Sequence, residues 1–340
     1  MMGDVPAALG LSPRDTAAVL ETAGLAPSVH NTQPWAFTLA PEAIALHVDP
    51  TRRLPIVDPQ DQELRISCGA ALFNLRLALQ GRGIRPEVTL CPDRARPGLV
   101  AEVRRGGTGP AAPEIVRLLD AVPRRRTNRH PFSNAPVGSP EQQNLCRAAA
   151  EQGTSLHLVH KPVQRRELNE LAAKAHRRQM ADPAFREELA RWTGTAPGRP
   201  DGVPVTAGGP LPAPQDRWVL RDFTGAAGRE RVPDKDFEDE PLIAVLTSPF
   251  TGRMGDVHVG EALQRVLLTA TLDGLAVSFL SQLVEVPDVR HAVQRLIGTI
   301  RPPQVVLRIG YGSPIVRTPR RAVADLPLDP DDASRRRPRS

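Results

Sequence analysis

Residues 26–37, APSVHNTQPWAF, place several polar side chains on one short segment. Their hydroxyl and amide groups can donate and accept hydrogen bonds, and they belong to Ser28, Asn31 and Gln33. Pro27 and Pro34 stiffen the segment, because the proline ring fixes φ. Such a loop can present donors and acceptors to a flat heterocycle. The alternative is a capping and turn segment, and in either case Trp35 and Phe37 are expected to anchor it in the core.

A second segment, RRRTNRHPF at 124–132, combines arginines with a hydroxyl group. The residues concerned are Arg125, Arg126, Thr127 and Arg129. A guanidinium group is planar and can donate two parallel hydrogen bonds to a phosphate. The segment therefore suits a bound phosphate. The alternative is a solvent-exposed basic turn at the end of a helix, where positive charge is favourable beside the helix dipole.

Other catalytic and metal-binding motifs are missing from the sequence. It contains no Gly-x-Ser-x-Gly, His-Glu-x-x-His, Gly-x-Gly-x-x-Gly or P-loop motif. Cys68, Cys91 and Cys146 are odd in number and far apart, which argues against a disulfide framework and a zinc site. The histidines are scattered, and a structural role suits His30 better than proton donation. We therefore expect neither a catalytic side chain nor a bound metal.

The composition is that of a globular protein, with 40% apolar and 24% charged residues among 340. No apolar run approaches the ~18 residues of a membrane span, and the first residues lack the features of a signal peptide. A cytoplasmic protein without a membrane partner is therefore expected. The net charge of +6 comes almost entirely from arginine, and 4% of the residues are aromatic. Base-composition bias explains this pattern at least as well as phosphate binding, so no nucleic-acid partner is expected.

The elements that must position these segments are repeated along the chain. The predicted elements are a helix at 13–24 with Ser12 as its N-cap, strands at 35–40 and 43–49, and a core helix at 61–80. Residues 69–84, GAALFNLRLALQGRGI, align without gaps on 260–275, GEALQRVLLTATLDGL. A weaker match sets 12–24 beside 139–153. Such a repeat predicts two half-chains of one plan, with a boundary between about 106 and 114.

The two halves carry different segments. The loop at 26–37 belongs to the first half, and the arginine-rich segment to the second. The second half also has an insertion at about 180–235, which predicts a disordered linker or a lid over a site. The expected domains are a first half at 1–110, a second half at 111–324, and a disordered tail at 325–340 with acidic and then basic residues.

The two segments together resemble the nitroreductase family. APSVHNTQPWAF is similar to the flavin-contacting segment of that family, and RRTNRHPF is similar to its basic motif, which holds the FMN phosphate and ribityl chain. In ordinary members the site forms at a homodimer interface, and this chain, with its motifs split between halves, resembles the fused Acg-type members. The resemblance covers about Arg14 to Arg321. It implies an α+β, nitroreductase-like fold in which two tandem halves form an intramolecular pseudo-dimer with a single FMN site.

The resemblance also implies roles for individual residues. At the flavin ring and ribityl region it places Pro27, Ser28 and Asn31, with Gln33 behind them. At the ribityl and phosphate end it places Arg125, Arg126, Thr127 and Arg129. The stretch GLAVSFLSQ resembles the segment whose backbone passes the reactive edge of the flavin, which implicates Ser278 to Ser281 and Gln282. Arg320, close to the C-terminus, is the candidate for a basic residue that returns to the phosphate, with a solvated role as its alternative.

The family chemistry is carried by the flavin, which explains why catalytic side chains are not needed. The resemblance implies an FMN-dependent oxidoreductase that passes electrons from NADH or NADPH to a nitroaromatic, quinone or similar acceptor by a ping-pong scheme. The alternative is a protein that stores, sequesters or senses FMN beneath a closed lid, without turnover. The expected partners are small molecules, and a monomer is compatible with a pseudo-dimer within one chain.

Overall fold

The computed structural model describes residues 5–196, 198–213, 216–218, 220–225, 238 and 240–328. The chain forms two compact units. The first comprises Met1–Arg124, Phe250–Arg265 and Arg320–Ser340, and the second comprises Arg125–Pro249 and Val266–Pro319. These units differ from the predicted halves at 1–110 and 111–324, because the start of one long helix and the C-terminal residues belong to the first unit.

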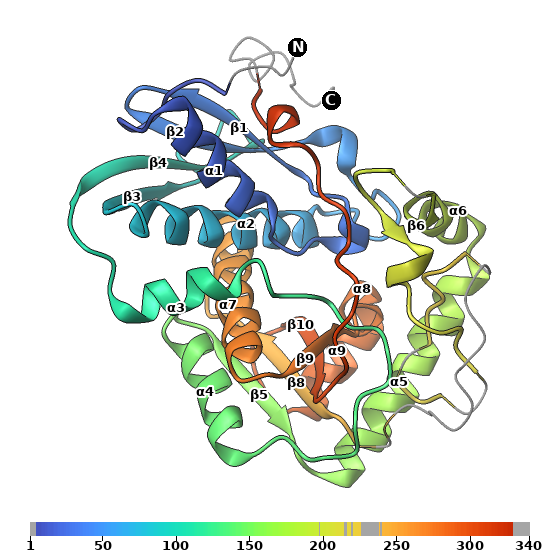
Figure 1. The fold of residues 1–340 in the computed structure, drawn as a ribbon. Coiled ribbons are helices and arrows are strands. Elements are labelled where there is room, and N and C mark those ends of the chain that lie inside the picture. The colour runs from blue at the N-terminus through green and yellow to red at the C-terminus, as the bar shows by residue number, and fades with distance from the viewer. Residues whose placement is uncertain are drawn as a thin grey trace. The chain divides into compact units, whose positions relative to one another are not determined.

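The first unit contains a four-stranded antiparallel sheet that packs against helices (Figure 1). Its strands, in the order β1-β2-β4-β3, are β1 (Trp35–Ala40), β2 (Ala43–Val48), β4 (Leu99–Thr108) and β3 (Ile84–Leu90). Its helices are α1 (Pro13–Gly24), α2 (Gln62–Gln80) and α3 (Pro113–Ala121), and its 3-10 turns are η1 (Val29–Asn31), η2 (Pro50–Arg52) and η4 (Val323–Asp325). The core lies between the sheet and the helices α1 and α2, and it includes the predicted anchors Trp35 and Phe37.

The sequence explains where the first helices begin. Ser12 caps α1, as predicted, because its Oγ accepts a hydrogen bond of 3.1 Å from the backbone N–H of Asp15. The carboxylate of Asp58 accepts hydrogen bonds of 2.8 Å from the backbone N–H groups of Gln62 and Leu64, at the start of α2. Apolar residues then keep α2 buried over most of its length, as expected of a core helix.

The second unit contains another four-stranded antiparallel sheet, with an added layer of helices. Its strands, in the order β5-β8-β10-β9, are β5 (Ser155–Val159), β8 (Leu242–Thr247), β10 (Pro303–Gly310) and β9 (Ala276–Phe279). Its helices are α4 (Ser139–Ala150), α5 (Pro162–Ala181), α6 (Pro183–Trp192), α8 (Gln282–Glu285) and α9 (Pro287–Leu296). The helix α7 (Gly252–Leu272) begins in the first unit and ends in the second. A core cluster joins residues of α5, α8 and α9 to the strands β8 and β10.

The two sheets share one topology, which confirms the predicted duplication and the α+β fold class. In each sheet the strands lie in the order first, second, fourth, third along the chain. A helix precedes the first strand in both sheets, α1 in one and α4 in the other. The long helices α2 and α7 connect the second strand to the third. The weak sequence match between 12–24 and 139–153 therefore corresponds to equivalent helices.

Within the first unit, α2 and α7 cross at the aligned glycines of the repeat. A Cβ atom on Gly69 would lie 2.1 Å from the carbonyl oxygen of Val257, and one on Gly260 would lie 2.0 Å from that of Ile66. Side chains cannot exist at these distances, so the crossing requires glycine on both helices. The contacts are reciprocal, because Ile66 and Val257 also correspond in the register of the repeat. A twofold homodimer makes contacts of this isologous kind.

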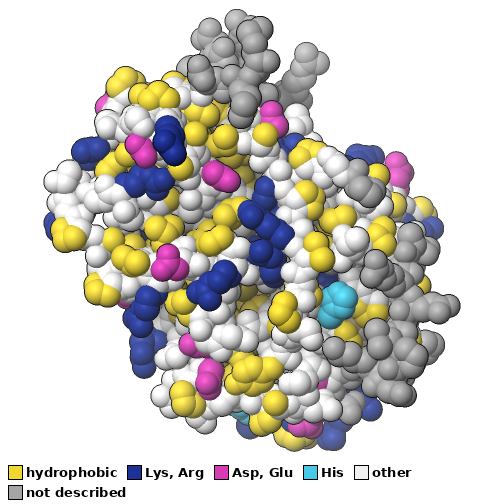
Figure 2. Space-filling model, in the orientation of Figure 1, with side chains coloured by type: hydrophobic (Ala, Val, Ile, Leu, Met, Phe, Trp, Pro, Cys, Tyr) yellow, Lys and Arg dark blue, Asp and Glu magenta, His cyan; other side chains and the backbone are white. Residues whose placement is uncertain are grey.

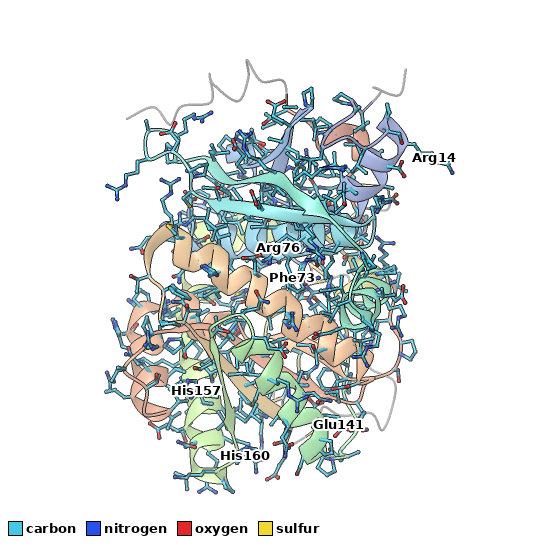
Figure 3. The ribbon with its side chains drawn as sticks, turned by 90° about the vertical axis from the view of Figure 1, so that its left-hand side faces the viewer. Arg14, Phe73, Arg76, Glu141, His157 and His160 are labelled. Carbon is cyan, nitrogen blue, oxygen red and sulfur yellow. The ribbon has the colours of Figure 1, made fainter. Side chains whose placement is uncertain are left out.

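Polar pairs between α2 and α7 flank this crossing. Arg65 forms an ion pair of 2.8 Å with Asp256, and Gln264 Nε2 donates a hydrogen bond of 2.8 Å to Asn74 Oδ1. Arg76 of α2 forms an ion pair with Glu261, and Figure 3 shows Arg76 beside α7. Buried polar groups need such partners, and the pairs fix the position of α7 along α2.

The insertion is larger and more ordered than the sequence predicts. The first half joins β1 to β2 by a tight turn, but the corresponding β5 and β8 are separated by everything between Val159 and Leu242. The inserted part therefore begins with α5 rather than near residue 180. It also contains β6 (Thr193–Thr195), which pairs in parallel with β7 (Val203–Pro204), and the turn η3 (Val205–Ala207). Residues 226–237, which the insertion was also expected to include, lie outside the described residues.

The predicted tail at 325–340 starts too early. Leu326 is 2% exposed, and its carbonyl oxygen accepts a hydrogen bond of 2.9 Å from the backbone N–H of Phe37. Residues 325–328 therefore belong to the first unit, because they pack on β1, whereas 329–340 lie outside the described residues.

On the face in Figure 2 the Lys and Arg side chains lie in separate groups rather than in a continuous stripe, as far as the described residues show. In the described part of the chain, every helix is too short or too polar to cross a membrane.

Candidate functional site

The first cluster of predicted site residues lies in the first unit, on residues 26–34, which we name the amide loop. Its backbone takes an unusual path, because His30, Asn31 and Gln33 all have left-handed φ values, of 48°, 57° and 51°. Asparagine and histidine are enriched in this region among residues other than glycine, but glutamine adopts it rarely. Each such residue costs on the order of 1–3 kcal/mol and persists only when its surroundings impose it. Strain of this kind concentrates at functional sites.

Hydrogen bonds hold the amide loop in this path. Ser28 Oγ accepts a hydrogen bond of 2.9 Å from the backbone N–H of Gln33. Gln33 is 1% exposed, and its Oε1 accepts a hydrogen bond of 2.9 Å from the backbone N–H of Arg321. Its side chain is therefore turned into the protein. Arg52 Nη1 adds a hydrogen bond of 2.8 Å to the carbonyl oxygen of Thr32.

Arg320 lies against the amide loop in the structure. Its Nη1 donates a hydrogen bond of 2.8 Å to Asn31 Oδ1. Its Nη2 faces the carbonyl oxygens of Leu25 and Ala26, at 3.4 and 3.2 Å. The sequence predicted a phosphate contact for Arg320, whereas these contacts are with the loop itself.

The second cluster lies in the second unit, on residues 124–132, which we name the arginine segment although Arg124 itself ends the first unit. Its backbone extends the sheet at the β9 edge: the N–H of Asn128 donates a hydrogen bond of 2.8 Å to the carbonyl oxygen of Val277. Asn128 Nδ2 donates another, of 3.0 Å, to the carbonyl oxygen of Ser313. These bonds bring Thr127 beside Val277 of β9, the residue that precedes Ser278 in the sequence.

The predicted residues that follow β9 are arranged by the helix α8. Ser281 precedes this helix, and its carbonyl oxygen accepts hydrogen bonds from the backbone N–H groups of Val284 and Glu285. Gln282 and Ser278 are both buried. The structure therefore brings the stretch 278–282 and the arginine segment to the same edge of one sheet, although they are far apart in the sequence.

Arg125 is the most unusual residue of the arginine segment. It is 5% exposed, and its Nε and Nη1 have no hydrogen-bond partner among the described residues. Burial, together with the positive charges of Arg126, Arg317 and Arg129, lowers its pKa to about 10. Arg125 is still a cation at neutral pH, so its charge is buried among other positive charges.

Other buried arginines in the same unit have acidic partners. Arg308 is 0% exposed and forms an ion pair of 2.8 Å with Glu238. Arg221 forms one of 2.7 Å with Glu285 and also donates to Gln179 Oε1. A buried charge without a counter-ion is expensive, which is why such pairs are the rule. Arg125 is an exception to this rule. A buried cation without an acidic partner is characteristic of an anion-binding site.

The other arginines of the segment differ in their contacts. Arg126 Nη1 donates a hydrogen bond of 2.9 Å to the carbonyl oxygen of Arg125, and burial followed by the charge of Arg317 lowers the pKa of Arg126. Arg317 was missed in the sequence, where nothing distinguishes it from its neighbours in VRTPRR. Its positive charge acts on both Arg125 and Arg126, so it belongs with the candidate phosphate residues.

The side chain of Arg129 contacts residues of the insertion. Its Nη1 donates a hydrogen bond of 3.1 Å to the carbonyl oxygen of Ala207, and its guanidinium lies 4.5 Å from the ring centroid of Phe223. A Cβ atom on Gly209 would lie 2.7 Å from the carbonyl oxygen of Arg129, so only glycine allows this approach. Burial, together with the positive charge of Arg221, lowers the pKa of Arg129 to about 10.

Comparisons with known proteins identify relatives of this chain. No protein-family model matches the chain. The chain is 32% identical over 326 residues to the protein named "Putative NAD(P)H nitroreductase Rv3131" of Mycobacterium tuberculosis H37Rv. The alignment covers 94% of this chain and 92% of the relative. It is 30% identical over 312 residues to "Putative NAD(P)H nitroreductase acg" of the same strain, covering 88% of this chain and 91% of the relative.

A solved structure shows a weaker similarity. The superposition on the FMN-bound nitroreductase from Bacteroides fragilis NCTC 9343 covers 58% of this chain and 88% of that protein's chain. The sequence identity is 14% and the TM-score is 0.37. The relationship therefore rests on the sequence matches.

Proposed function

The chain belongs to the family of these NAD(P)H nitroreductases, and from this membership we propose that it is a flavoprotein that binds FMN and accepts electrons from NADH or NADPH. Arg125 is the observation that carries the proposal. A buried, positively charged guanidinium surrounded by further arginines requires an anion, and the phosphate of FMN supplies one. Arg126, Thr127 and Arg317 would complete the phosphate and ribityl contacts.

The amide loop supplies the groups that a flavin ring needs. Pro27, Ser28 and Asn31 would lie at the ring and ribityl region, and the stretch 278–282 would supply backbone groups near the reactive edge. Bound FMN accepts a hydride and passes it on, so the protein must bind and orient the ring and place hydrogen bonds beside it. The strained path of the loop supports this role, because its donors and acceptors are held in place before a ligand arrives.

The proposed reaction is the reduction of a nitroaromatic, quinone or similar acceptor. Donor and acceptor would use the same exposed flavin face in turn, which gives ping-pong kinetics. The duplicated topology supports a pseudo-dimer, and since the chain has one amide loop and one arginine segment, we expect one FMN site per chain.

The second candidate function is storage or sensing of FMN. It is favoured by the insertion, which is fastened to the arginine segment through Arg129 and to α8 through Arg221. A lid held in this way would exclude nicotinamide from the flavin.

The visible absorption spectrum of the FMN-reconstituted protein tests both functions. The spectrum is recorded without oxygen before and after NADPH is added. Loss of the oxidised flavin band supports the reductase, and a bound flavin that NADPH leaves oxidised supports storage or sensing. A protein that takes up no FMN would refute both.

A further inference from the structure

The C-terminal residues 320–328, which we name the C-terminal strap, pass along the strand that follows the amide loop. Phe37 of β1 donates its backbone N–H to Leu326 at 2.9 Å and accepts one from Leu328 at 2.6 Å. Pro327 forms a parallel bridge with the same residue. The buried side chain of Leu326 belongs to the core cluster of the first unit. The strap is therefore built into this unit.

Two adjacent arginines of the strap contact the amide loop. Arg321 donates its backbone N–H to Gln33 Oε1, and its Nη1 reaches the carbonyl oxygens of Gln33 and Trp35 at 3.3 and 3.0 Å. Arg320 binds Asn31 Oδ1 at 2.8 Å, across 289 positions of sequence. Asn31 and Gln33 are two of the three residues whose left-handed φ values give the loop its path. The C-terminal strap therefore binds the strained part of the amide loop.

The chemistry of these contacts requires arginine. Arg320 spreads its guanidinium over a side-chain oxygen and the carbonyl oxygens of Leu25 and Ala26. Arg321 combines two carbonyl contacts with the carboxylate of Asp49, 3.9 Å away. A lysine carries the same charge, but it is a single point that cannot span such a set of acceptors.

We propose that the C-terminal strap sets the geometry of the flavin ring site, with Arg320 and Arg321 as positioning residues that act through Asn31 and Gln33. Arg320 is then not a phosphate ligand, in contrast to the expectation from the sequence. This inference rests on the proposed FMN binding, since it concerns how the amide loop meets the ring.

The test compares Arg320→Met and Arg320→Lys with the wild type, using FMN and riboflavin, which lacks the phosphate. If Arg320 positions the loop, both variants lower the affinity for both flavins by a similar factor, about ten-fold for the loss of one charge-assisted hydrogen bond. Both also change the absorption spectrum of the bound, saturating FMN, because the surroundings of the ring have changed. Lysine does not restore the wild-type spectrum, although it keeps the charge.

A matched control is available in the same unit. Arg105 also donates two hydrogen bonds to a carbonyl oxygen, that of Leu9, and it does not contact the amide loop in the structure. Arg105→Met should lower the melting temperature without changing the spectrum or affinity of bound FMN. This control separates loss of stability from loss of geometry. If Arg320→Met does not fold, Arg320→Lys and Arg321→Lys carry the comparison.

Each alternative gives a different result. If Arg320 binds the phosphate, Arg320→Met weakens FMN but not riboflavin, the spectrum of the bound flavin stays that of the wild type, and lysine rescues the affinity. If neither affinity nor spectrum changes, the strap has no influence on the site. Both results would overturn the inference while leaving FMN binding intact, whereas a wild-type protein that binds no flavin refutes the proposed function itself.

Discussion

Arg125 combines burial with a charge that its described surroundings do not neutralise. Replacing it by methionine keeps the apolar stem and removes the charge. We expect Arg125→Met to lower FMN affinity by about 1.5–3 kcal/mol, or ten- to more than a hundred-fold, because a charge-assisted contact with the phosphate is lost. The apo protein should be at least as stable as the wild type, since a buried cation without a counter-ion destabilises the folded state.

Flavin titration and thermal unfolding with and without FMN measure these two effects. Arg124→Met is the control, because Arg124 is exposed and binds the carbonyl oxygen of Asp120 on the preceding helix. It should leave the affinity unchanged. Equal affinities for Arg125→Met and the wild type would remove the arginine segment from the FMN site.

His47 makes the stability of the first unit depend on pH. Burial lowers the pKa of His47 from 6.5 to about 4, assisted by the charge of Arg96, and its Nε2 lies 3.1 Å from Thr38 Oγ1. Above pH 6.5 the imidazole is neutral in the folded and unfolded chains alike. Between pH 6.5 and about 4 the unfolded chain takes up a proton that the folded chain resists, so the free energy of unfolding falls.

At pH 5 this loss amounts to about 2 kcal/mol. Urea unfolding of the wild type and of His47→Gln at pH 7 and pH 5 measures it. The variant cannot titrate at this position, so its stability should fall less than that of the wild type between the two pH values. An identical fall in both proteins would show that His47 is not responsible.

At the scale of elements, the insertion is connected to the arginine segment through Arg129 and through Glu238, whose carboxylate accepts a hydrogen bond of 2.8 Å from the backbone N–H of Phe132. Arg129→Met removes the hydrogen bond to Ala207 and the cation–π contact with Phe223. Together they contribute about 1–2 kcal/mol, which corresponds to a five- to thirty-fold increase in local opening. Limited proteolysis should therefore cut residues 193–225 faster by this factor, and reduction of bound FMN by NADPH should become faster if the insertion controls access.

Arg126→Met is the matched comparison for this element. It lies in the same segment, and its Nη1 donates a hydrogen bond to the carbonyl oxygen of Arg125. We expect it to weaken FMN binding while leaving the proteolysis of the apo protein at the wild-type rate. Equal proteolysis rates for Arg129→Met and the wild type would show that Arg129 does not hold the insertion.

The sequence predicts elements well where the signal is local or repeated. The cap at Ser12, the core helix and the aligned glycines were all visible, and the glycines mark the place where α2 and α7 cross. The insertion was harder to predict, because its order comes from long-range contacts such as that of Arg221 with Glu285. At the site, the roles of Arg317 and Arg320 could not be predicted from the sequence for the same reason. Both occur in VRTPRR, and only the fold separates the arginine beside Arg125 from the one that binds Asn31.

At the scale of the whole molecule, duplication should make the chain self-sufficient. The family resemblance implies that ordinary members build their site from two subunits, whereas this chain contains both kinds of segment once. We expect one FMN per chain and an FMN affinity that does not change with protein concentration, because no second chain is needed. Light scattering of the reconstituted protein, with flavin absorbance recorded on the same elution peak, gives the mass and the stoichiometry together.

The informative result is the flavin content of the monomer peak. A monomer that carries one FMN supports a pseudo-dimer that works within one chain. A colourless monomer with flavin confined to a dimer peak would instead mean that the segments of two chains cooperate, and the duplicated fold would then have kept the intermolecular site of its relatives. The reciprocal contacts of Gly69 and Gly260 favour the first result, because α7 already occupies the place that a second subunit's helix would take on α2.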